Sequence, residues 1–190
     1  GLDVERAPDG SVLVADLEVP AVLVRRAATV ARRRGSTTVV DPAFADRVDD
    51  EILALADHLT PDHTEAEQLT GIDTTSVEGA TEAAGQLRGR GARTVHVKLA
   101  DGGCVTATAD GVLLVAAPDD VPVVDTTGAG DAFAGGLATA LAGGASMDVA
   151  VIRAVAASTC AVTRYGSQES YPDRSRLRAM ADRVRVRPLA

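Results

Sequence analysis

One segment of the sequence concentrates the residue types that phosphate chemistry uses. Residues 121–141 read VPVVDTTGAGDAFAGGLATAL, in which an apolar stretch ends at Asp125, a short turn holds two glycines, and an alanine-rich helix follows at once. Gly128 and Gly130 allow close backbone approach, and the first amides of the helix point toward the turn with the positive end of the dipole behind them. The segment therefore predicts a buried strand, a glycine turn and an anion site at a helix start.

Asp131 stands in the first turn of that predicted helix. Beside a bound phosphate, its carboxylate could act as a general base toward a substrate hydroxyl. The carboxylate could instead only complement the helix dipole, and the segment alone leaves both roles open. Two other phosphate motifs are excluded, because Phe133 stands where the dinucleotide fingerprint needs its third glycine and the chain holds no GxxxxGK[ST] loop.

The elements that must position this segment alternate between strand-like and helix-like stretches. The β-branched runs at residues 11–17 and 36–42 are each followed by an apolar-periodic stretch, which is typical of parallel βαβ units. Helices are predicted for residues 64–71 and 76–91, each ending at a glycine. Three short runs within residues 92–118, separated by DGG and DG turns, predict a strand followed by a hairpin.

The last third of the sequence predicts two long alanine-rich helices, residues 128–142 and 147–164, and a final helix near residues 173–184. There is no repeat and no linker long enough to divide the chain, and 190 residues suit one ordinary domain. We therefore expect a single α/β domain over residues 1–190 with a mostly parallel sheet.

Composition limits the class of protein and its partners. Hydrophobic residues make up 46% and charged residues 24%, which indicates a soluble globular protein, and the 2% of aromatics predicts an aliphatic, alanine-packed core. The net charge of −8 repels phosphate backbones, so nucleic acid is not an expected partner. No apolar run approaches the roughly 20 residues of a spanning helix, so no membrane is expected. Cys104 and Cys160 predict two buried thiols in a reducing cytoplasm.

The motif DTTGAGDAFAGGL, residues 125–137, resembles the carboxy-terminal signature of the ribokinase-like, or PfkB, family of carbohydrate kinases. Residues 59–71, LTPDHTEAEQLTG, resemble the family's segment after a central strand, and residues 161–172, AVTRYGSQESYP, resemble the loop that closes its nucleotide site. The resemblance implies a ribokinase-like three-layer fold. The family's amino-terminal Gly-Gly sugar motif and lid strands find no counterpart, so we expect the carboxy-terminal part of a family member.

The implied reaction is ATP-dependent transfer of the γ-phosphoryl group to a primary hydroxyl of a sugar, with Mg²⁺ bridging the phosphates. Four residues of the motif take catalytic roles by resemblance: Asp131 as base, and the amides of Gly128, Ala129 and Gly130 as the anion hole. Asp62 and Glu65 fall in the family's phosphate and magnesium environment, Glu65 through water. The family usually has Asn at position 62, so Asp62 adds negative charge there. The alternative for this pair is an acidic helix N-terminus.

Further nucleotide and cation contacts follow from the resemblance. The segment KLADGG, with Lys98, Ala100 and Gly103, resembles the nucleotide-contacting end of a strand, with Ala100 in the place of a family glycine. Lys98 could equally be a solvated charge at a strand end. Val155 occupies a position where members often place a polar residue against adenine, so an apolar contact with the base is expected. A monovalent cation such as K⁺ is implied near Asp125, Thr127, Ala161, Arg164, Gly166 and Ser170.

Two other functions stay open beside the kinase. A truncated or degenerate kinase could bind nucleotide without turnover, as a binding or interaction module, and a scaffold that binds no nucleotide would leave the anion hole without a ligand. The expected partners are ATP, a sugar and, as in family members that pair through the lid, a second copy. The groups that select the sugar belong to the part without a counterpart, so the sequence does not identify it. His58, His63 and His96 lack metal spacing and predict solvated or hydrogen-bonded side chains.

Overall fold

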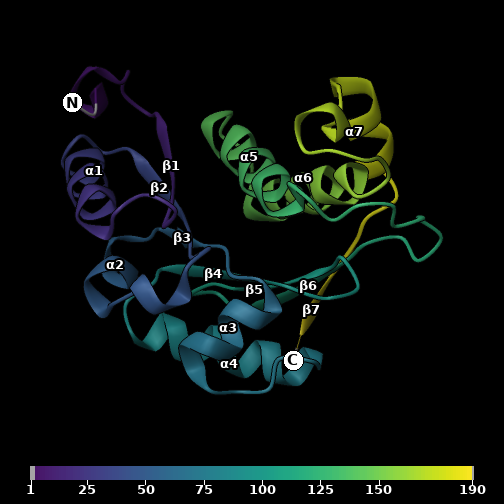
Figure 1. Cartoon of the computed structure of the whole chain (residues 1–190), viewed down its shortest axis with the longest axis horizontal. Helices are drawn as coiled ribbons and strands as arrows, with labels where there is room; N and C mark the ends of the chain where they lie inside the picture. Colours follow the sequence, from purple (N-terminus) through teal and green to yellow (C-terminus); the bar gives the residue numbers. More distant parts are fainter. Residues whose placement is uncertain (1–2, 190) are drawn as a thin grey trace.

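A seven-stranded sheet runs between two layers of helices in the computed structural model, which describes residues 3–189 (Figure 1). The strands are β1 Val12–Asp16, β2 Thr37–Asp41, β3 His58–Leu59, β4 Thr94–Lys98, β5 Cys104–Ala107, β6 Val112–Ala116 and β7 Arg185–Leu189. They lie side by side in chain order; β1 to β4 pair in parallel, and β4 to β7 pair antiparallel. The α/β class and the three-layer arrangement are confirmed, whereas the sheet is mixed rather than mostly parallel, with three parallel and three antiparallel strand pairs.

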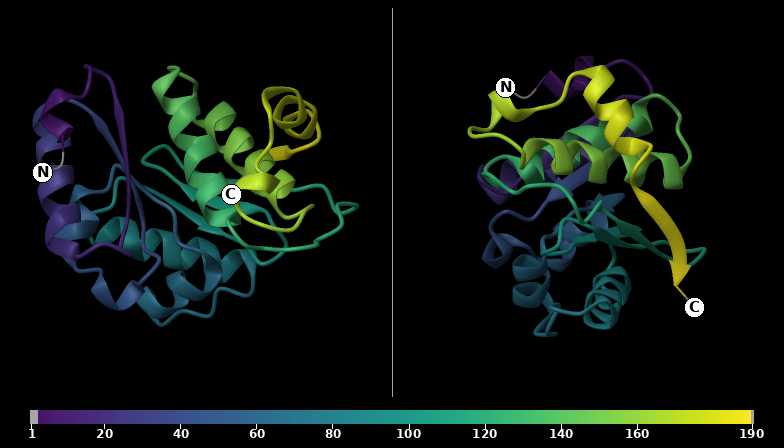
Figure 2. Two further views of the ribbon diagram at one scale, coloured as in Figure 1. Left: turned by 45° about the horizontal axis from the view of Figure 1, so that its top comes forward. Right: turned by 90° about the vertical axis from the view of Figure 1, so that its right-hand side faces the viewer.

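Helices cover both faces of the sheet (Figure 2). One face carries α1 Ala21–Arg33, α2 Asp50–Leu55, α3 His63–Thr70 and α4 Val77–Gly89, and the other carries α5 Ala129–Ala142, α6 Met147–Ala161 and α7 Arg174–Ala181. Short 3₁₀ turns occupy Asp3–Arg6, Ala45–Arg47 and Gln168–Ser170. The helices that connect the parallel strands all lie on one face of the sheet. The other face is covered by α5, which follows the glycine turn, and by α6 and α7.

Small side chains let the second helical layer lie close together. Phe133 is buried on α5, but most of its neighbours in that core are alanine and valine. Gly136 is required by this packing, because a Cβ there would lie 3.0 Å from the Cβ of Ala157 and 3.0 Å from the carbonyl oxygen of Arg153. Close packing against α6 therefore fixes the direction of α5 and, with it, the position of the glycine turn.

Several local predictions are confirmed. Gly71 ends α3 with a left-handed φ of 74°, and Gly91 follows α4 with a φ of 127°. Cys104 and Cys160 are free and buried. His58 and His96 are buried and hydrogen-bonded to each other, with 3.0 Å between Nδ1 of His58 and Nε2 of His96.

Apart from these predictions, no helix within residues 3–189 has the length and apolar character needed to cross a membrane.

The region before the glycine turn differs from its prediction. Residues 121–125 form no strand, and the side chain of Val123 is 67% exposed. The amides of Val124 and Asp125 donate to the carbonyl of Val162 instead, at 2.7 and 3.3 Å. The prediction of a buried strand here was wrong, because the free edge of β6 is taken by another segment of the chain.

That segment is β7, which lies directly after the final helix predicted near residues 173–184 and for which no strand was predicted. The helix α7 ends at Ala181, and Arg185–Leu189 pairs with β6. Pro188 is tolerated because β7 is an edge strand. The preceding helix α6 also ends earlier than expected, at Ala161, and the chain from Val162 onward forms a loop.

Candidate active site

The carboxyl ends of β2, β3 and β4 meet at one edge of the sheet and bring polar side chains together. Lys98, at the end of β4, places its Nζ 3.0 Å from Oδ2 of Asp41 at the end of β2, and each side chain is 15% exposed. The hydroxyl of Thr60 donates to the same carboxylate oxygen at 2.9 Å. The alternative of a solvated Lys98 was wrong, because the ammonium group is largely buried and paired.

Lys98 is the only lysine in the chain, whereas 18 other basic residues are arginine. A compact ammonium is a point charge that suits a phosphate oxygen without imposing a fork geometry. Asp41 was not predicted as a site residue, because 57 residues separate it from its partner Lys98 in the sequence. The available signal was its place directly after the buried strand run TTVV.

Asp62 and Glu65 start α3 as a capping box. Oδ1 of Asp62 accepts from the amide of Glu65 at 2.8 Å, and Oε2 of Glu65 accepts from the amide of Asp62 at 2.7 Å. The alternative structural role of this pair, at an acidic helix start, is therefore present in the structure. Burial raises the pKa of Glu65 to about 7; Asp41 and Asp62 add to this, while the Asp62 amide and Lys98 oppose it.

The glycine turn lies in close contact with the loop after α6 and with Lys98. Gly128 has a left-handed φ of 77°, and a Cβ there would lie 3.0 Å from the Cβ of Ser167 and 3.1 Å from the hydroxyl of Tyr171. Next to it, the Cβ of a side chain at Gly130 would lie 3.3 Å from Nζ of Lys98. Lys98 at the end of β4 and the first turn of α5 therefore lie close together at Gly130.

The amides of this turn differ in part from the predicted anion hole. The amide of Ala129 donates to the carbonyl of Thr126 at 3.1 Å, so it is engaged within the turn. The amides of Gly128, Gly130 and Asp131 have no hydrogen-bond acceptor among residues 3–189. The amide of Ala129, which was predicted to bind the anion, instead closes the tight turn. The amide of Asp131, which was not predicted to do so, is free to bind a ligand.

A pocket of about 450 Å³ lies between the loop after β4, the start of α5 and the end of α6. The predicted nucleotide contacts Asp62, Lys98, Ala100 and Gly103 line it together with Ala129 and Gly130. Val155 does not line it and is fully buried in the core, so the predicted contact of Val155 with the base is not supported. Ser158 and Thr159, one turn further along α6, line the pocket instead, together with Val162 directly after the helix.

Asp125 ties the glycine turn to the loop after α6. Its Oδ1 accepts from the amide of Thr127 at 2.9 Å, and its Oδ2 accepts from the amide of Gly166 at 3.0 Å. These backbone hydrogen bonds hold the pKa of Asp125 below its usual value. In that loop, the hydroxyl of Ser170 donates to the carbonyl of Ser167 at 2.6 Å. The residues of the predicted cation site therefore belong to two segments, the glycine turn and the loop after α6, which are joined by a hydrogen bond.

The remaining members of that predicted cation set are placed differently. Ala161 is buried at the end of α6, and Arg164 is exposed in the loop. No group of three or more His, Cys, Asp or Glu side chains within residues 3–189 could hold a metal ion. A cation at this point would therefore depend on carbonyl groups and on the single carboxylate of Asp125.

The family model of pfkB family carbohydrate kinases matches residues 9–174. The chain belongs to this family. It is 38% identical over 162 residues to a ribokinase of Haemophilus influenzae, covering 85% of this chain and 53% of that protein. A ribokinase of Staphylococcus aureus is 34% identical over 177 residues, covering 90% and 57%. The chain thus spans about half the length of these curated relatives.

Solved structures agree with the pfkB assignment. Arabidopsis thaliana ribokinase complexed with ribose and ATP matches with a TM-score of 0.83 and 28% identity, over 90% of this chain and 55% of that one. Thermotoga maritima ribokinase matches with a TM-score of 0.83 and 31% identity, over 95% and 60%. The ribokinase-like fold expected from the resemblance is confirmed.

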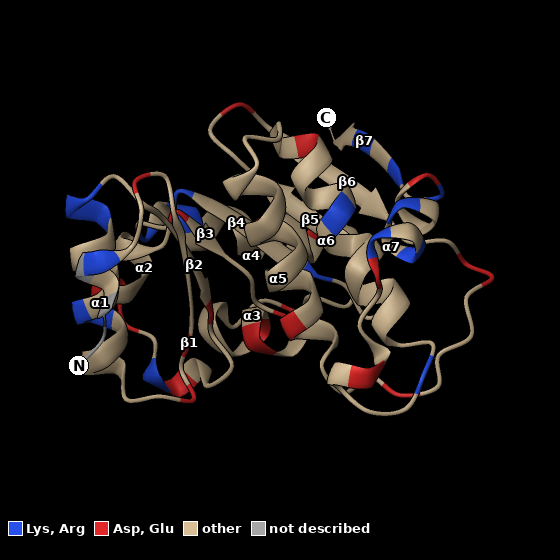
Figure 3. Ribbon diagram, turned by 90° about the horizontal axis from the view of Figure 1, so that it is seen from above, with Lys and Arg blue, Asp and Glu red and all other residues tan. Residues whose placement is uncertain are grey.

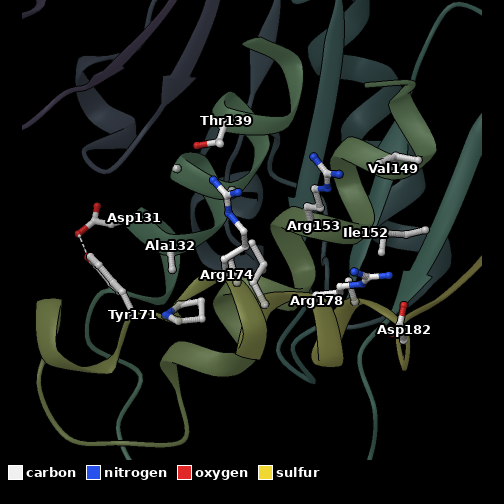
Figure 4. A pocket seen from close by; sticks show the side chains of 16 residues that line it. Asp131, Ala132, Thr139, Val149, Ile152, Arg153, Tyr171, Arg174, Arg178 and Asp182 are labelled. Carbon is white, nitrogen blue, oxygen red and sulfur yellow. Dashed lines mark hydrogen bonds between the residues drawn. The ribbon is translucent and has the colours of Figure 1, made fainter. Parts of the chain in front are cut away.

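In this pfkB chain, Asp131 follows Gly130 in the first turn of α5 but does not line the pocket that Lys98 lines. Its carboxylate is exposed and accepts from the hydroxyl of Tyr171 at 3.4 Å (Figure 4). Partial burial and the neighbouring carboxylate of Asp131 raise the pKa of Tyr171. The sequence analysis assigned no role to Tyr171, although it lies in the loop segment that resembles the family.

Proposed function

We propose that this chain carries the ATP site and the catalytic base of a carbohydrate kinase, which transfers the γ-phosphoryl group of ATP to a primary hydroxyl of a sugar. The observation that carries this proposal is the set of three unpartnered amides at the α5 start, at Gly128, Gly130 and Asp131, together with the ammonium group of Lys98, which lies close to Gly130. Amides at a helix start and a buried cation are the groups that stabilise a transferring phosphoryl group.

The residues divide the reaction between them. Asp131 accepts the proton of the sugar hydroxyl, and its partner Tyr171 holds the carboxylate in place. As the sugar oxygen bonds to the γ-phosphorus, the bond from phosphorus to the bridging oxygen breaks and ADP leaves. The free amides and Lys98 stabilise the charge on the equatorial oxygens. Because this chemistry needs little covalent help, placing the two reactants supplies most of the rate.

The acidic side chains suit Mg²⁺ in this reaction. Mg²⁺ is usually held by one or two carboxylates together with substrate phosphates and water, and Asp62 and Glu65 offer such donors beside the pocket. When bound, Mg²⁺ neutralises charge on the phosphates. We also propose that a monovalent cation such as K⁺ binds near Asp125, where it would hold the glycine turn against the loop at Gly166.

The single lysine gives a direct test of the nucleotide site. The chain is treated with a limiting amount of an amine-acetylating reagent, and the modified fraction of Lys98 is measured by mass spectrometry. ATP with Mg²⁺ is expected to slow acetylation of Lys98 severalfold, while the amino terminus, the other reactive amine, serves as the internal control. Ribose alone should protect less. Equal acetylation with and without ATP would contradict the proposed site.

Turnover separates the kinase from its alternative. The chain covers about half of its relatives, so a module that binds nucleotide without turnover is the second candidate. Sugar-dependent ADP formation is measured over a panel of pentoses and hexoses with the protein encoded by the complete reading frame. Formation of ADP with one of the sugars supports the kinase. Protection of Lys98 with no ADP above the rate without sugar supports the binding module instead.

A further inference from the structure

The pocket proposed for the nucleotide is lined by two groups of residues of different character. Its charged and titratable side chains come from the start of α3 and from the end of β4 with the loop that follows: Asp62, His63, Lys98 and Asp101. The lining residues within 117–123 and 158–162 are apolar or carry a hydroxyl group. Because the phosphates of a nucleotide belong beside Lys98 in the proposed function, the base belongs among this second group, which we call the base end.

The base end has no side chain that would impose a fixed hydrogen-bond pattern on a base. No charged residue lies between Arg153 and Arg164, so the last two turns of α6 carry no charge (Figure 3). The chain contains no asparagine, and its three glutamines, Gln68, Gln86 and Gln168, do not line the pocket. Side-chain amides and charged groups are the usual readers of a base edge. Contact with the base edge is therefore left to hydroxyl groups and to the main chain.

Of the two hydroxyl groups at the base end, one is engaged and the other can adapt. Thr159 is buried, and its Oγ1 donates to the carbonyl of Val155 at 2.7 Å. Oγ of Ser158 donates to the same carbonyl at 3.0 Å, but this side chain is only partly buried. Since the carbonyl keeps its bond from Thr159, the Ser158 hydroxyl can turn toward a ligand. A serine hydroxyl either donates to an oxo group or accepts from an amino group, so it suits both.

The main chain of the base end offers donors that suit every purine. The amides of Val121 and Val123 have no acceptor within residues 3–189. Adenine and guanine share the acceptor N7, whereas position 6 carries an amino group in adenine and an oxo group in guanine. An amide that binds N7 therefore favours purines over pyrimidines without distinguishing one purine from another.

We propose that this site takes purine nucleoside triphosphates as a class, binding ATP, ITP and GTP with similar affinity, and that Ser158 is the side chain that adapts to the group at position 6. The inference rests on the proposed nucleotide site and concerns which bases that site takes. A site with fixed hydrogen-bonding groups rejects a mismatched analogue by about 10⁴-fold or more, whereas a largely apolar site discriminates far less. With one rotatable hydroxyl, the three purines should differ by no more than about tenfold.

The first test is a calorimetric titration of the protein of the complete reading frame with Mg²⁺ and each of ATP, ITP, GTP and CTP, without sugar. The three purine nucleotides should have Kd values within about tenfold of one another. CTP, which lacks the second ring and N7, should bind at least about tenfold more weakly than ATP. A preference for ATP of more than tenfold over ITP or GTP would overturn the proposal, as would equal binding of CTP.

The second test asks whether Ser158 contacts position 6. Ser158→Ala should weaken ATP and ITP by about threefold to tenfold each, as expected for one lost hydrogen bond. Purine riboside triphosphate, which carries only hydrogen at position 6, should bind the variant and the wild type equally. Ser175→Ala, on α7 and outside the pocket, is the matched control and should change nothing. No loss for ATP and ITP, or the same loss for all three nucleotides, would overturn the role of Ser158.

Acetylation of Lys98 in the same samples separates this inference from the proposed function. If ATP neither gives heat nor protects Lys98, the nucleotide site itself is refuted, and the inference fails with it. If ATP protects Lys98 but ITP and GTP at the same concentrations do not, the nucleotide site stands and only the tolerance of purines is refuted. Protection by all three purine nucleotides, each at ten times the Kd of ATP, is the expected result.

Discussion

Glu65 offers the sharpest test of the electrostatics at the edge of the sheet. Its carboxyl is buried beside Asp41 and Asp62, and its pKa is raised from 4.5 to about 7. Between pH 4.5 and pH 7 the folded chain therefore holds a proton that the unfolded chain has released. The free energy of unfolding contributed by this group is fully present below pH 4.5 and is lost as the pH rises through about 7.

The size of the effect follows from that interval. At 1.36 kcal/mol per pH unit it corresponds to roughly 3 kcal/mol, and because the side chain is partly exposed, screening by water reduces this to about 1–2 kcal/mol. Glu65→Gln removes the titration but keeps the capping box, because a glutamine oxygen can accept from the Asp62 amide as well. As the pH rises from 4 to 8, the free energy of unfolding of the variant should therefore increase by about 1–2 kcal/mol relative to that of the wild type.

The measurement is urea unfolding of both proteins at half-unit steps of pH. The difference between the two curves isolates Glu65, since His58 and the other titrating groups contribute equally to both. Glu67→Gln, an exposed neighbour on α3, is the control and should run parallel to the wild type. A difference between Glu65→Gln and wild type that stays constant over this range, or that changes in the opposite direction, would refute the buried position of Glu65.

Three substitutions test the reaction itself in the complete protein. Asp131→Asn should lower kcat by about 10² or more while nucleotide affinity stays within a few fold, because a general base acts mainly on the transition state; unchanged turnover would exclude that role. Gly130→Val should weaken both nucleotide binding and Lys98 protection, because its Cβ would stand 3.3 Å from Nζ of Lys98 and fill the gap between them; equal protection would contradict the pocket. Tyr171→Phe removes the 3.4 Å contact that positions the Asp131 carboxylate and should lower kcat severalfold with little change in KM, whereas unchanged turnover would leave Tyr171 with a structural role only.

The sequence was sufficient where local chemistry decides the structure. Glycines ended α3 and α4 as predicted, because a left-handed residue at a helix end favours glycine whatever surrounds it. The start of α5 behind Gly128 was equally local. The parallel units from β1 to β4 followed from the alternation of β-branched and helix-periodic runs, which is a property of neighbouring residues.

The predictions failed where two distant segments compete or where a helix has no polar face. Residues 121–125 have the composition of a strand, but β7 pairs with β6 instead, and no local pattern ranks these two candidates. Val155 was misplaced because α6 is apolar on most of its circumference, so its periodicity does not show which side meets the pocket. Asp41 and Tyr171 reach the site only through tertiary contacts across 57 and 40 residues.

The spacing of the glycine motif gains a physical meaning from the two hollows on either side of α5. Successive helical residues are rotated by about 100°, so adjacent positions face different directions. Ala129 and Gly130 line the pocket proposed for the nucleotide, whereas Asp131 and the following Ala132 line a second hollow between α5, α6 and α7. In the proposed reaction, the amide of Gly130 and the carboxylate of Asp131 therefore come from adjacent residues that line different hollows. This separation suits the proposed transfer, because an in-line reaction needs the attacking and leaving oxygens on opposite sides of the transferred phosphorus.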